Sequence, residues 1–484
     1  MIVMKFGGTS VEDETAIQRV ADIVLSRAEE RPVIVVSAFA GITDSLLAIS
    51  RAAASGSVDE ALQSLRKLRR RHLAVSGALL EGRAEAAVRE QIQPLFDSLQ
   101  DMLRGVAALG ELSVRTSDNI LSTGELLSSR IVTAALEAHG IHSVLVDSRR
   151  CIVTDASHTR AIPLFDQTCE RLLDQVKPLL QASRVPVMGG FIGATTMGVP
   201  TTLGRGGSDF SAAIVGAALN AQRIEIWTDV EGMMTTDPRL CPRAQRINVI
   251  GFDEASELAY FGAKVLHPAT LIPAVEKNIP VYVLNSRKPA NKGTWIRARA
   301  PRSRTTFRAI AAKTGIKVIN VRSPRVLMAH GLLRRLFETF ERHSCAPDLV
   351  STSEASISVA LDSSSDVGGL LRDLQNLGEV EVENGKAIIC LVGKGIRGRV
   401  GIAASVFNAV AAANVNVHMI SQGASEINIS FVVEEDDVPK AVLALHKRFF
   451  EAKGSAPADD LRAARTKLGV LSFPDRERLR QEVV

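Results

Sequence analysis

The chain has 484 residues, of which 46% are hydrophobic and 23% charged, and its formal net charge is +5. A chain of this length is expected to form roughly two to four domains, each large enough to bury its own core. The small basic excess gives no indication of a nucleic-acid partner, and none is expected. The densest basic run, RKLRRR at residues 66–71, lacks interleaved aromatic residues and is typical of a solvated helix face.

Cysteine use and the first apolar run bear on metal binding and location. The cysteines contain no C-x-x-C pair, so we expect reduced thiols and no metal site built from protein side chains. No signal peptide or membrane span is expected, because Lys5 and a glycine pair interrupt the first apolar run and no later run reaches about 18 residues. The chain is therefore predicted to be cytoplasmic and without membrane contact.

Short apolar strands alternate with amphipathic helices from residue 1 to about 300. Strands are predicted at residues 31–38, 142–148, 184–191, 223–230 and 279–286, and helices at 13–29, 124–139 and 208–220. An all-helical insert is predicted at about 58–110, and the polar segment 300–307 is predicted to be a linker. This alternation indicates an α/β domain over residues 1–300, with a doubly wound, mostly parallel sheet covered by helices on both faces.

The chain after the linker repeats itself. Residues 317–377 align without a gap on residues 387–447, an offset of 70 residues that pairs Gly331 with Gly401, Phe337 with Phe407, Ser351 with Ser421, Ile357 with Ile427 and Asp366 with Asp436. Apolar strands and helix faces coincide as well. The repeat predicts two copies of a β-α-β-β-α-β unit.

The second copy lacks a strong final strand. LGVLSF at 468–473 is a weak candidate, whereas RAIAAK at 308–313, just before the first copy, could fill the same place. In that case one domain comprises residues 308–313 and 385–450, and a second domain, residues 314–384, is inserted into it. No function is assigned to the tail at 451–484.

A dinucleotide motif within the second copy is rejected. Gly393, Gly395 and Gly398 spell G-x-G-x-x-G between a predicted strand and a predicted helix. The strand that follows, VNVHMIS, ends without the acidic residue that would hold a ribose. We therefore expect no nicotinamide cofactor.

The opening stretch MKFGGTSV, residues 4–11, is a strand that ends in a glycine pair. Gly7 and Gly8 would let backbone N–H groups approach an anion at a helix start near Thr9, and Lys5 would reach the same anion. The alternative is a tight turn with a snorkelling lysine, and this stretch alone gives the two interpretations equal weight. The chain has no Walker A sequence, so it is not a P-loop kinase.

Further stretches carry charged or hydroxyl side chains beside predicted strand ends and helix starts. TTLGRGGSD at 201–209 combines a helix capped by Ser208 with Arg205, a forked donor suited to a carboxylate or phosphate. STGELLS at 122–128 places Glu125 in the first turn of a helix, where an acid at a helix start is the plain structural explanation. The others are VSAFAGITD at 36–44, WTDVEGMMTTDPR at 227–239 and FGAKVLHP at 261–268.

Together these stretches resemble the aspartate kinases of the amino-acid kinase family over essentially residues 1–450, through KFGGTSV, GRGGSD, TDP and FGAKVLHP in this order. The single-function, lysine-sensitive type is most similar, because of GELLS, WTDV and TSE. The resemblance implies a kinase domain followed by two ferredoxin-like α+β ACT domains. It also implies ATP-dependent phosphorylation of the β-carboxylate of L-aspartate to 4-phospho-L-aspartate, the first step toward lysine, threonine and methionine.

The resemblance also assigns roles to residues of this chain. Lys5 and Asp209 are implied as catalytic, with Lys5 on the transferring phosphoryl group and Asp209 orienting the phosphate-binding groups. ATP is implied to bind Lys5, Gly7, Gly8, Thr228, Asp229, Met234, Arg239 and Lys264. Aspartate is implied to bind Ser37, Thr43, Glu125, Arg205 and Ser208, with Arg205 on its α-carboxylate and Glu125 on its ammonium group. Met234 departs from the family pattern, because lysine-sensitive relatives tend to have Tyr at this nucleotide contact.

The implied reaction needs charge neutralisation rather than a general base. The β-carboxylate of aspartate, with a pKa of about 3.9, is already ionised at neutral pH. Lysines, backbone amides and Mg²⁺ then neutralise the phosphoryl oxygens in a loose transition state. The Mg²⁺ that accompanies ATP is expected to be held mainly by phosphates and water.

Regulation by an amino acid is implied at the first ACT domain. The effector site would comprise Val326, Met328, Gly331, Leu332, Leu333, Asp348, Thr352, Ser353 and Glu354. Helix N–H groups would bind the effector carboxylate and Asp348 its ammonium group, with lysine as the first choice of effector and threonine as the alternative. Asp348 could instead simply begin a strand at a surface turn. A homodimer or homotetramer formed through the ACT domains is expected.

Two other functions remain open from the sequence. Another amino-acid kinase, acting on glutamate or a nucleoside monophosphate, would keep the glycine turns but would not be expected to carry the tandem repeat. A non-enzymatic sensor would need only the repeat. Retention of Lys5, Arg205, Asp209 and Lys264 favours a catalytic protein over that sensor.

Overall fold

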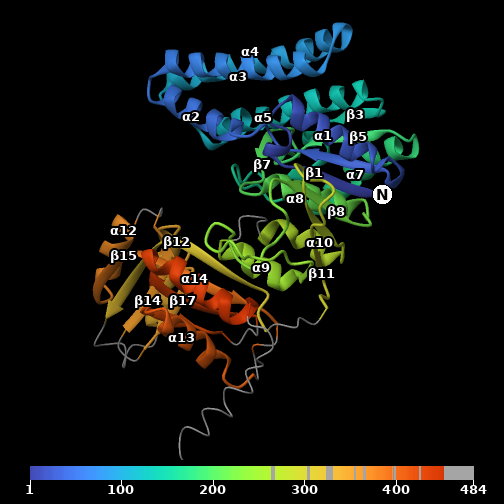
Figure 1. Ribbon diagram of the computed structural model, residues 1–484. Coiled ribbons are helices and arrows are strands. Elements are labelled where there is room, and N and C mark those ends of the chain that lie inside the picture. The colour runs from blue at the N-terminus through green and yellow to red at the C-terminus, as the bar shows by residue number, and fades with distance from the viewer. Residues whose placement is uncertain are drawn as a thin grey trace, which may run out of the picture. The chain divides into compact units, whose positions relative to one another are not determined.

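The computed structural model describes residues 1–262, 268–301, 306–322, 331–353, 356–363, 367–394, 396, 399–423 and 427–451. Two compact units make up the chain (Figure 1). The first contains Met1–Thr235 and Gln245–Arg302, and the second contains Thr236–Ala244 and Ser303–Val484. Within the described ranges, every helix is too short or too polar to cross a lipid bilayer.

Eight strands form the main sheet of the first unit, in the order β3-β5-β2-β1-β8-β10-β11-β9. Their bounds are β1 Ile2–Phe6, β2 Pro32–Val36, β3 Ser143–Val146, β5 Val185–Gly189, β8 Ile224–Thr228, β9 Val249–Gly251, β10 Val281–Asn285 and β11 Thr294–Arg297. All neighbours are parallel except β10 and β11. Every residue of β1, β2 and β5 is buried, which explains their runs of valine and isoleucine. The predicted α/β class is confirmed.

The remaining elements of the first unit are helices, short turns and a small sheet. The helices are α1 Glu14–Leu25, α2 Ile42–Ala54, α3 Val58–Leu79, α4 Gly82–Leu109, α5 Val114–Ala138, α6 Ser148–Cys151, α7 Phe165–Gln181, α8 Gly207–Ala218, α9 Phe252–Tyr260 and α10 Ile272–Glu276. The turns are η1 Gly8–Ser10, η2 Ala28–Glu30 and η3 Pro268–Leu271, and the small sheet contains β4 Val153–Thr154, β6 Ile192–Thr195 and β7 Pro200–Thr202. The predicted helical insert is present as α3 and α4.

Two helix starts near the glycine-rich stretches differ from the prediction. The segment at Thr9 is only a single 3-10 turn, and α1 begins later because the Asp13 carboxylate accepts a hydrogen bond from the amide of Ala16 at 2.8 Å. Helix α8 is preceded by Gly206 in the left-handed region (φ 73°), so Ser208 lies in the first turn instead of capping it. Both prediction errors misplace a helix terminus by a few residues.

The helical insert packs against the loop between β2 and α2. His72 of α3 is fully buried, and its ring stacks on Phe39 of that loop with centroids 4.8 Å apart. Burial lowers the pKa of His72 to about 4, so the ring is neutral at physiological pH. The stacking of Phe39 on His72 therefore holds the loop against the helical insert.

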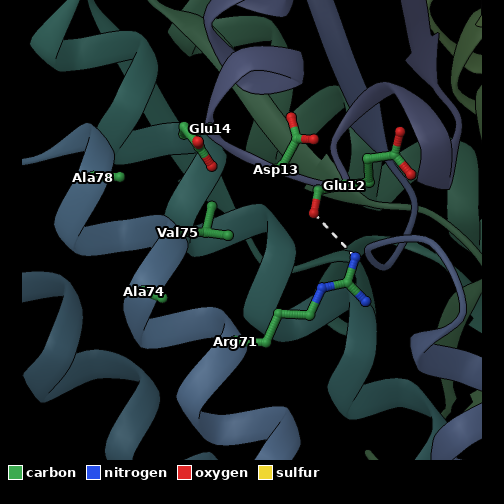
Figure 2. A pocket seen from close by; sticks show the side chains of 7 residues that line it. All are labelled: Glu12, Asp13, Glu14, Arg71, Ala74, Val75 and Ala78. Carbon is green, nitrogen blue, oxygen red and sulfur yellow. Dashed lines mark hydrogen bonds between the residues drawn. The ribbon is translucent and has the colours of Figure 1, made fainter.

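Arg71 holds the same loop by a hydrogen bond. Its guanidinium donates to the carbonyl oxygen of Ala40 at 2.9 Å. It also donates to the carbonyl oxygen of Glu12 at 3.0 Å, the hydrogen bond drawn in Figure 2. A solvated face was expected for the whole basic run that contains Arg71. For this residue the expectation is wrong, because its long side chain reaches carbonyl groups of two loops.

Six strands form the sheet of the second unit, in the order β13-β14-β12-β15-β17-β16 with all neighbours antiparallel. The strands are β12 Ala309–Arg322, β13 Leu349–Thr352, β14 Ser356–Asp362, β15 Glu379–Val392, β16 Met419–Ser421 and β17 Asn428–Glu434. The helices are α11 Leu332–Arg342, α12 Gly368–Gln375, α13 Ile402–Ala412 and α14 Val438–His446. Two short segments flank α14, the 3-10 turn η5 Glu435–Asp437 and the π-helical turn η6 Lys447–Glu451. The predicted antiparallel α+β class is confirmed.

The internal repeat is confirmed by the element bounds. Helix α13 begins and ends 70 residues after α11, at Ile402–Ala412 against Leu332–Arg342, and α14 starts 70 residues after α12. Each copy has a hydrophobic core of its own, one around Leu336 and Phe340 and the other around Val406 and Phe431.

Strands β12 and β15 each pass through both copies. The first part of β12, Ala309–Lys313, pairs with Val392–Ile388 of β15, and its second part pairs with β14. A register shift separates the two parts, next to Gly315 at φ 69°. The segment RAIAAK thus lies beside the second copy, whereas the competing candidate LGVLSF lies outside the described residues.

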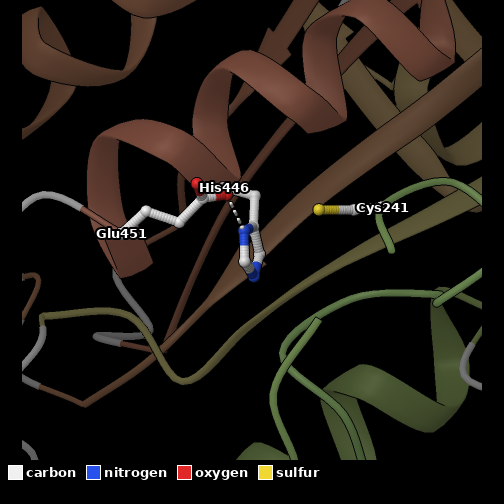
Figure 3. A group of neighbouring side chains, drawn as sticks. All are labelled: Cys241, His446 and Glu451. Carbon is white, nitrogen blue, oxygen red and sulfur yellow. Dashed lines mark hydrogen bonds and ion pairs between the residues drawn. The ribbon is translucent and has the colours of Figure 1, made fainter. Parts of the chain in front are cut away.

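The segment Thr236–Ala244 belongs to the second unit and packs into it through Cys241. The Cys241 side chain is buried in the core of the second copy, and Figure 3 shows its sulfur facing the ring of His446. His446 Nδ1 lies 2.9 Å from a carboxylate oxygen of Glu451, whose other oxygen lies 2.6 Å from Arg243. Thiol, imidazole and carboxylate are all types of metal ligand. In this group, however, the charge of Glu451 is already balanced by Arg243, so the carboxylate does not need a metal ion as its partner.

Arg71→Met should loosen the loop at residues 37–41, because it removes two charge-assisted hydrogen bonds that contribute on the order of 2 kcal/mol. We expect a lower midpoint of thermal unfolding and faster amide hydrogen exchange at residues 36–44. Arg70→Met is the matched control, since Arg70 is exposed on the same helix. Equal exchange in the two variants would contradict a bracing role for Arg71.

Candidate active site

Loops that follow parallel strands of the first unit meet at one edge of the main sheet, because parallel strands share their carboxyl ends. A cleft of about 630 Å³ opens at this edge. The residues singled out in the sequence that line it are Lys5, Gly8, Ser37, Thr43, Glu125, Arg205, Ser208 and Asp209. They come from β1 and η1, the loop between β2 and α2, the first turn of α2, helix α5, the loop between β7 and α8, and the start of α8, and the fold brings them together.

A buried ion pair lies at the centre of these elements. Lys5, on β1, is 8% exposed, and its Nζ atom lies 2.7 Å from Oδ1 of Asp209 in the first turn of α8. The pair gives the buried ammonium group a partner of opposite charge. It also connects the end of β1 to the start of α8.

The glycine pair allows close approach of two loops. A Cβ atom on Gly8 would lie 2.9 Å from the carbonyl oxygen of Ala38, which is too short for any side chain. The Gly8 carbonyl accepts a hydrogen bond from Ala40 at 3.2 Å, and the Gly7 amide donates to Trp227 at 3.0 Å. The Gly7 amide therefore extends the pairing of β1 with β8, and the Gly8 backbone contacts the loop that lines the cleft.

Glu125 lies in the middle of a helix and not at its start. Helix α5 begins at Val114, because the Ser113 hydroxyl accepts a hydrogen bond from the amide of Thr116. The prediction that Glu125 occupies a first turn is therefore wrong. The first residues of α5 are mostly polar, and its apolar pattern becomes clear only later in the helix. The start of the helix was therefore not recognised from the sequence.

The Glu125 carboxyl group is buried with one oxygen unused. The residue is 3% exposed, Oε1 accepts a hydrogen bond from the amide of Ala38 at 3.1 Å, and Oε2 has no hydrogen-bond partner in the described part of the chain. Burial raises the pKa of Glu125 to about 8, against the smaller opposing effects of the Ala38 amide and the Lys5 charge. A cation that entered the cleft would favour the ionised form.

Arg205 lies on the other wall of the cleft. It belongs to the loop between β7 and α8, is exposed, and has no carboxylate within ion-pair distance among the described residues. Its guanidinium is therefore available to an anionic ligand. The cleft thus presents a buried acid, an ion-paired lysine and an unpaired arginine to one small volume.

The residues expected to bind nucleotide are only partly brought to this edge. Thr228 ends β8, and its carbonyl accepts hydrogen bonds from the amide and hydroxyl of Ser286, at 2.8 and 3.1 Å. Asp229 follows it, and Met234 lies further along in the first unit, in a bridge with Arg246.

Two further cations, Arg239 and Lys264, were expected at the nucleotide. Arg239 belongs to the second unit, where its exposed guanidinium pairs with Asp237 at 2.6 Å. Lys264 lies outside the described residues.

Sequence reasoning missed several residues that line the cleft. They are Phe39, Asp44, Thr159, Phe191 and Thr202. Asp44 and Thr202 lie within the quoted stretches VSAFAGITD and TTLGRGGSD, so their position beside Thr43 and Arg205 was an available signal. Thr159 lies in a loop without any pattern, and only the fold places it here.

The residues expected at the effector site are described in part. Gly331, at φ 93°, precedes α11, which begins with Leu332 and Leu333, and Thr352 and Ser353 lie at the end of β13. Val326, Met328 and Glu354 lie outside the described residues.

Asp348 is a buried partner of an ion pair. Its side chain is 6% exposed, and Lys313 Nζ lies 2.8 and 2.6 Å from its two oxygens. Asp348 directly precedes β13, as the alternative has it, but its side chain is buried in an ion pair and not exposed at a surface turn. The carboxylate already holds one ammonium group of this chain.

Comparison with known proteins agrees with this architecture. The amino acid kinase family model matches residues 1–285, and an ACT domain model matches residues 389–449. Lysine-sensitive aspartokinase 3 of Escherichia coli (strain K12) is 38% identical over 460 residues, which cover 93% of this chain and 99% of the relative. The chloroplastic aspartokinase 1 of Arabidopsis thaliana is 36% identical over 466 residues, covering 93% and 80%.

Solved structures show the same similarity. The crystal structure of E. coli aspartokinase III in complex with aspartate and ADP (R-state) matches with a TM-score of 0.82 and 37% identity, and covers 93% of this chain and 99% of that chain. The structure of the same enzyme in complex with lysine and aspartate (T-state) has a TM-score of 0.79 at the same identity and coverage. The chain therefore belongs to the amino acid kinase family and, within it, to the aspartate kinases, which transfer a phosphoryl group from ATP to the β-carboxylate of aspartate.

Proposed function

We propose that the cleft at the end of β1 is where this chain binds aspartate and the phosphoryl end of ATP. The observation that carries the proposal is the meeting of Lys5, Glu125 and Arg205 in one cleft, although they lie far apart in the sequence. Aspartate carries one ammonium group and two carboxylates, so it needs one anionic and two cationic partners. The complex of E. coli aspartokinase III with aspartate and ADP supports this assignment.

The binding of aspartate follows from the charges of the cleft. The unused oxygen of Glu125 accepts the ammonium group, and Arg205 forms a two-pronged pair with the α-carboxylate. The hydroxyl groups of Ser37, Thr43 and Ser208 complete the polar lining. This orientation directs the β-carboxylate toward Lys5.

Catalysis then rests on charge neutralisation by Lys5. The ionised β-carboxylate attacks the γ-phosphorus, and the Lys5 ammonium offsets the charge of the phosphoryl oxygens. Asp209 holds the Lys5 side chain in place through their ion pair. The ion pair with Lys5 occupies the Asp209 carboxylate. The cleft therefore suits a Mg²⁺ ion that arrives with ATP and keeps phosphate and water as its ligands.

The nucleotide is assigned to the loops after β1 and β8. Gly7 and Gly8 lie beside the phosphates, and Thr228, Asp229 and Met234 bind the nucleoside end. Arg239 and Lys264 are assigned to the phosphates, in line with the family pattern. The register of β1 with β8 supports the first part of this assignment, since their carboxyl ends are adjacent.

Regulation is assigned to the second unit. We assign lysine as the effector, supported by the lysine complex of E. coli aspartokinase III, and threonine is the alternative. The carboxylate of the effector binds at the start of α11, near Gly331, Leu332 and Leu333, and Asp348 binds an ammonium group. Because Lys313 already occupies Asp348, an effector ammonium must share or displace it.

We propose the domain division from the strand pairing. Residues 1–300 are assigned to the kinase domain, although Thr236–Ala244 within this range belongs to the second unit. Residues 308–313 with 385–450 are assigned to one ACT domain, and residues 314–384 to the inserted one. The pairing of Ala309–Lys313 with β15 supports this division. A homodimer or homotetramer through the ACT domains, and a product that supplies lysine, threonine and methionine synthesis, complete the proposal.

Lys5→Met should lower kcat by at least about a hundredfold, because it removes a preorganised charge from the transferring phosphoryl group. The KM for aspartate should change little. Initial rates with aspartate and MgATP measure both constants. Near-normal turnover in the variant would reduce Lys5 to a structural role.

Glu125→Gln should raise the KM for aspartate and also stabilise the protein at alkaline pH. The folded pKa of about 8 lies above the unfolded value near 4.5, so the free energy of unfolding contributed by Glu125 is largest at acid pH. It is lost as pH rises from about 4.5 to 8, by on the order of 4 kcal/mol. Thermal unfolding of variant and wild type at pH 5 and 9 measures this difference.

The exposed Glu137, on the same helix, provides the matched control as Glu137→Gln. This control should change neither the KM for aspartate nor the pH dependence of unfolding. If Glu125→Gln unfolds with the same pH dependence as the wild type, the carboxyl group is not protonated in the folded protein at neutral pH.

Asp348→Asn should shift the lysine inhibition curve by at least about tenfold, because it removes the charge assigned to the effector ammonium. Asp362→Asn is the matched control, since that carboxylate lies 3.8 Å from Lys313 and is 48% exposed. Inhibition curves at fixed aspartate and ATP measure the shift. Equal lysine sensitivity in the two variants would remove Asp348 from the effector site.

A further inference from the structure

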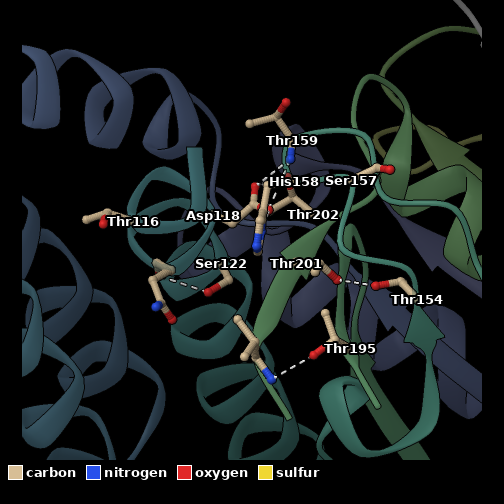
Figure 4. Close-up of polar contacts among 12 residues, drawn as sticks. Thr116, Asp118, Ser122, Thr154, Ser157, His158, Thr159, Thr195, Thr201 and Thr202 are labelled. Carbon is tan, nitrogen blue, oxygen red and sulfur yellow. Dashed lines mark hydrogen bonds and ion pairs between the residues drawn. The ribbon is translucent and has the colours of Figure 1, made fainter. Parts of the chain in front are cut away.

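A second buried acid lies on the helix that carries Glu125. Asp118 of α5 is fully buried, seven residues before Glu125. Its Oδ2 lies 2.7 Å from Nδ1 of His158, and its Oδ1 accepts a hydrogen bond from the Thr202 hydroxyl at 2.6 Å. The amide of Thr159 donates to both oxygens, at 3.1 and 3.0 Å (Figure 4).

The partners of Asp118 come from two loops that line the cleft. Thr159 lies between β4 and α7, and Thr202 ends β7, directly before the loop that carries Arg205. The two loops touch, since a Cβ on Gly204 would lie 3.1 Å from the Thr159 carbonyl oxygen. Asp118 thus fastens both loops to α5.

The hydrogen bonds from the Thr159 amide to Asp118 hold a strained backbone conformation. Thr159 has φ 69°, in the left-handed region that β-branched residues rarely adopt. Its amide is held by both oxygens of Asp118, which stabilises this conformation. The carboxylate in turn needs all of its donors, because a buried charge with a missing partner is costly.

We propose that Asp118, His158 and Thr202 form a positioning unit that sets the separation of Glu125 and Arg205, and so holds these two groups at the spacing that binds the ammonium and α-carboxylate groups of aspartate. The inference rests on the proposed aspartate site. Glu125 lies on α5 with Asp118, and Arg205 lies three residues after Thr202. No member of the unit is assigned a contact with substrate, so the unit acts through the two groups that have one.

The test compares three substitutions on one strand. Thr202→Val removes the hydroxyl that donates to Asp118, and Thr202→Ser keeps it. Thr201→Val is the matched control. Thr201 is fully buried, and its hydroxyl lies 2.7 Å from that of Thr154 (Figure 4). The control variant therefore loses a comparable hydroxyl contact that does not involve Asp118. For each variant, kcat, the KM values for aspartate and ATP, and the midpoint of thermal unfolding are measured.

Thr202→Val should raise the KM for aspartate by about tenfold or more, with the KM for ATP within about twofold of the wild type. Thr202→Ser should restore the KM for aspartate. Thr201→Val should lower the unfolding midpoint without raising that KM. The inference is overturned if Thr201→Val and Thr202→Val raise it equally, or if Thr202→Val leaves it unchanged.

A second variant covers the case in which Thr202→Val does not fold. The His158 side chain is 12% exposed, so the space left by His158→Ala borders solvent, and this variant should give the same change in the KM for aspartate. An unchanged KM in this variant also overturns the inference.

Two further variants separate this inference from the proposed function. If Glu125→Gln and Arg205→Ala leave the KM for aspartate unchanged, the aspartate site itself is misassigned. If they raise it while Thr202→Val and His158→Ala do not, only the positioning role fails.

Discussion

The ion pair between Lys5 and Asp209 is the contact on which the rest of the site depends. It joins the end of the central strand β1 to the first turn of α8, and so fixes the helix start beside the loop of Arg205. A lysine on a fully buried strand is stable only with such a partner. The close approach at Gly8, the braced loop at Phe39 and the buried acid at Glu125 surround this one pair of charges.

Local pattern was enough to predict most of the fold. The buried strands of the first unit are short runs of valine and isoleucine, and the second unit repeats at a constant offset, so both classes follow from the sequence. The glycine-rich stretches also led to Lys5 and Arg205, because a strand that ends in glycine and passes into a helix is a local signal. The role of Asp209 came from the resemblance to aspartate kinases.

What the sequence could not show depends on contacts between distant segments. Arg71 lies in a run of six basic and apolar residues that looks uniformly solvated, and only the fold brings the carbonyl groups of Ala40 and Glu12 to it. Glu125 was misplaced because polar residues open its helix. Asp348 was predicted to bind an effector ammonium group, and its ion pair was not foreseen because its partner, Lys313, lies on a strand 35 residues earlier. Burial and ion pairing between distant segments produce no periodic pattern in the sequence.

The two long strands of the second unit have a thermodynamic consequence. Ile310 and Ile319, both on β12, belong to the separate cores of the two copies, so one backbone element is an integral part of both. Neither core can melt without exposing a strand edge of the other. The two copies should therefore lose their structure in a single cooperative transition, and the free energy of any ligand bound to one copy stabilises both.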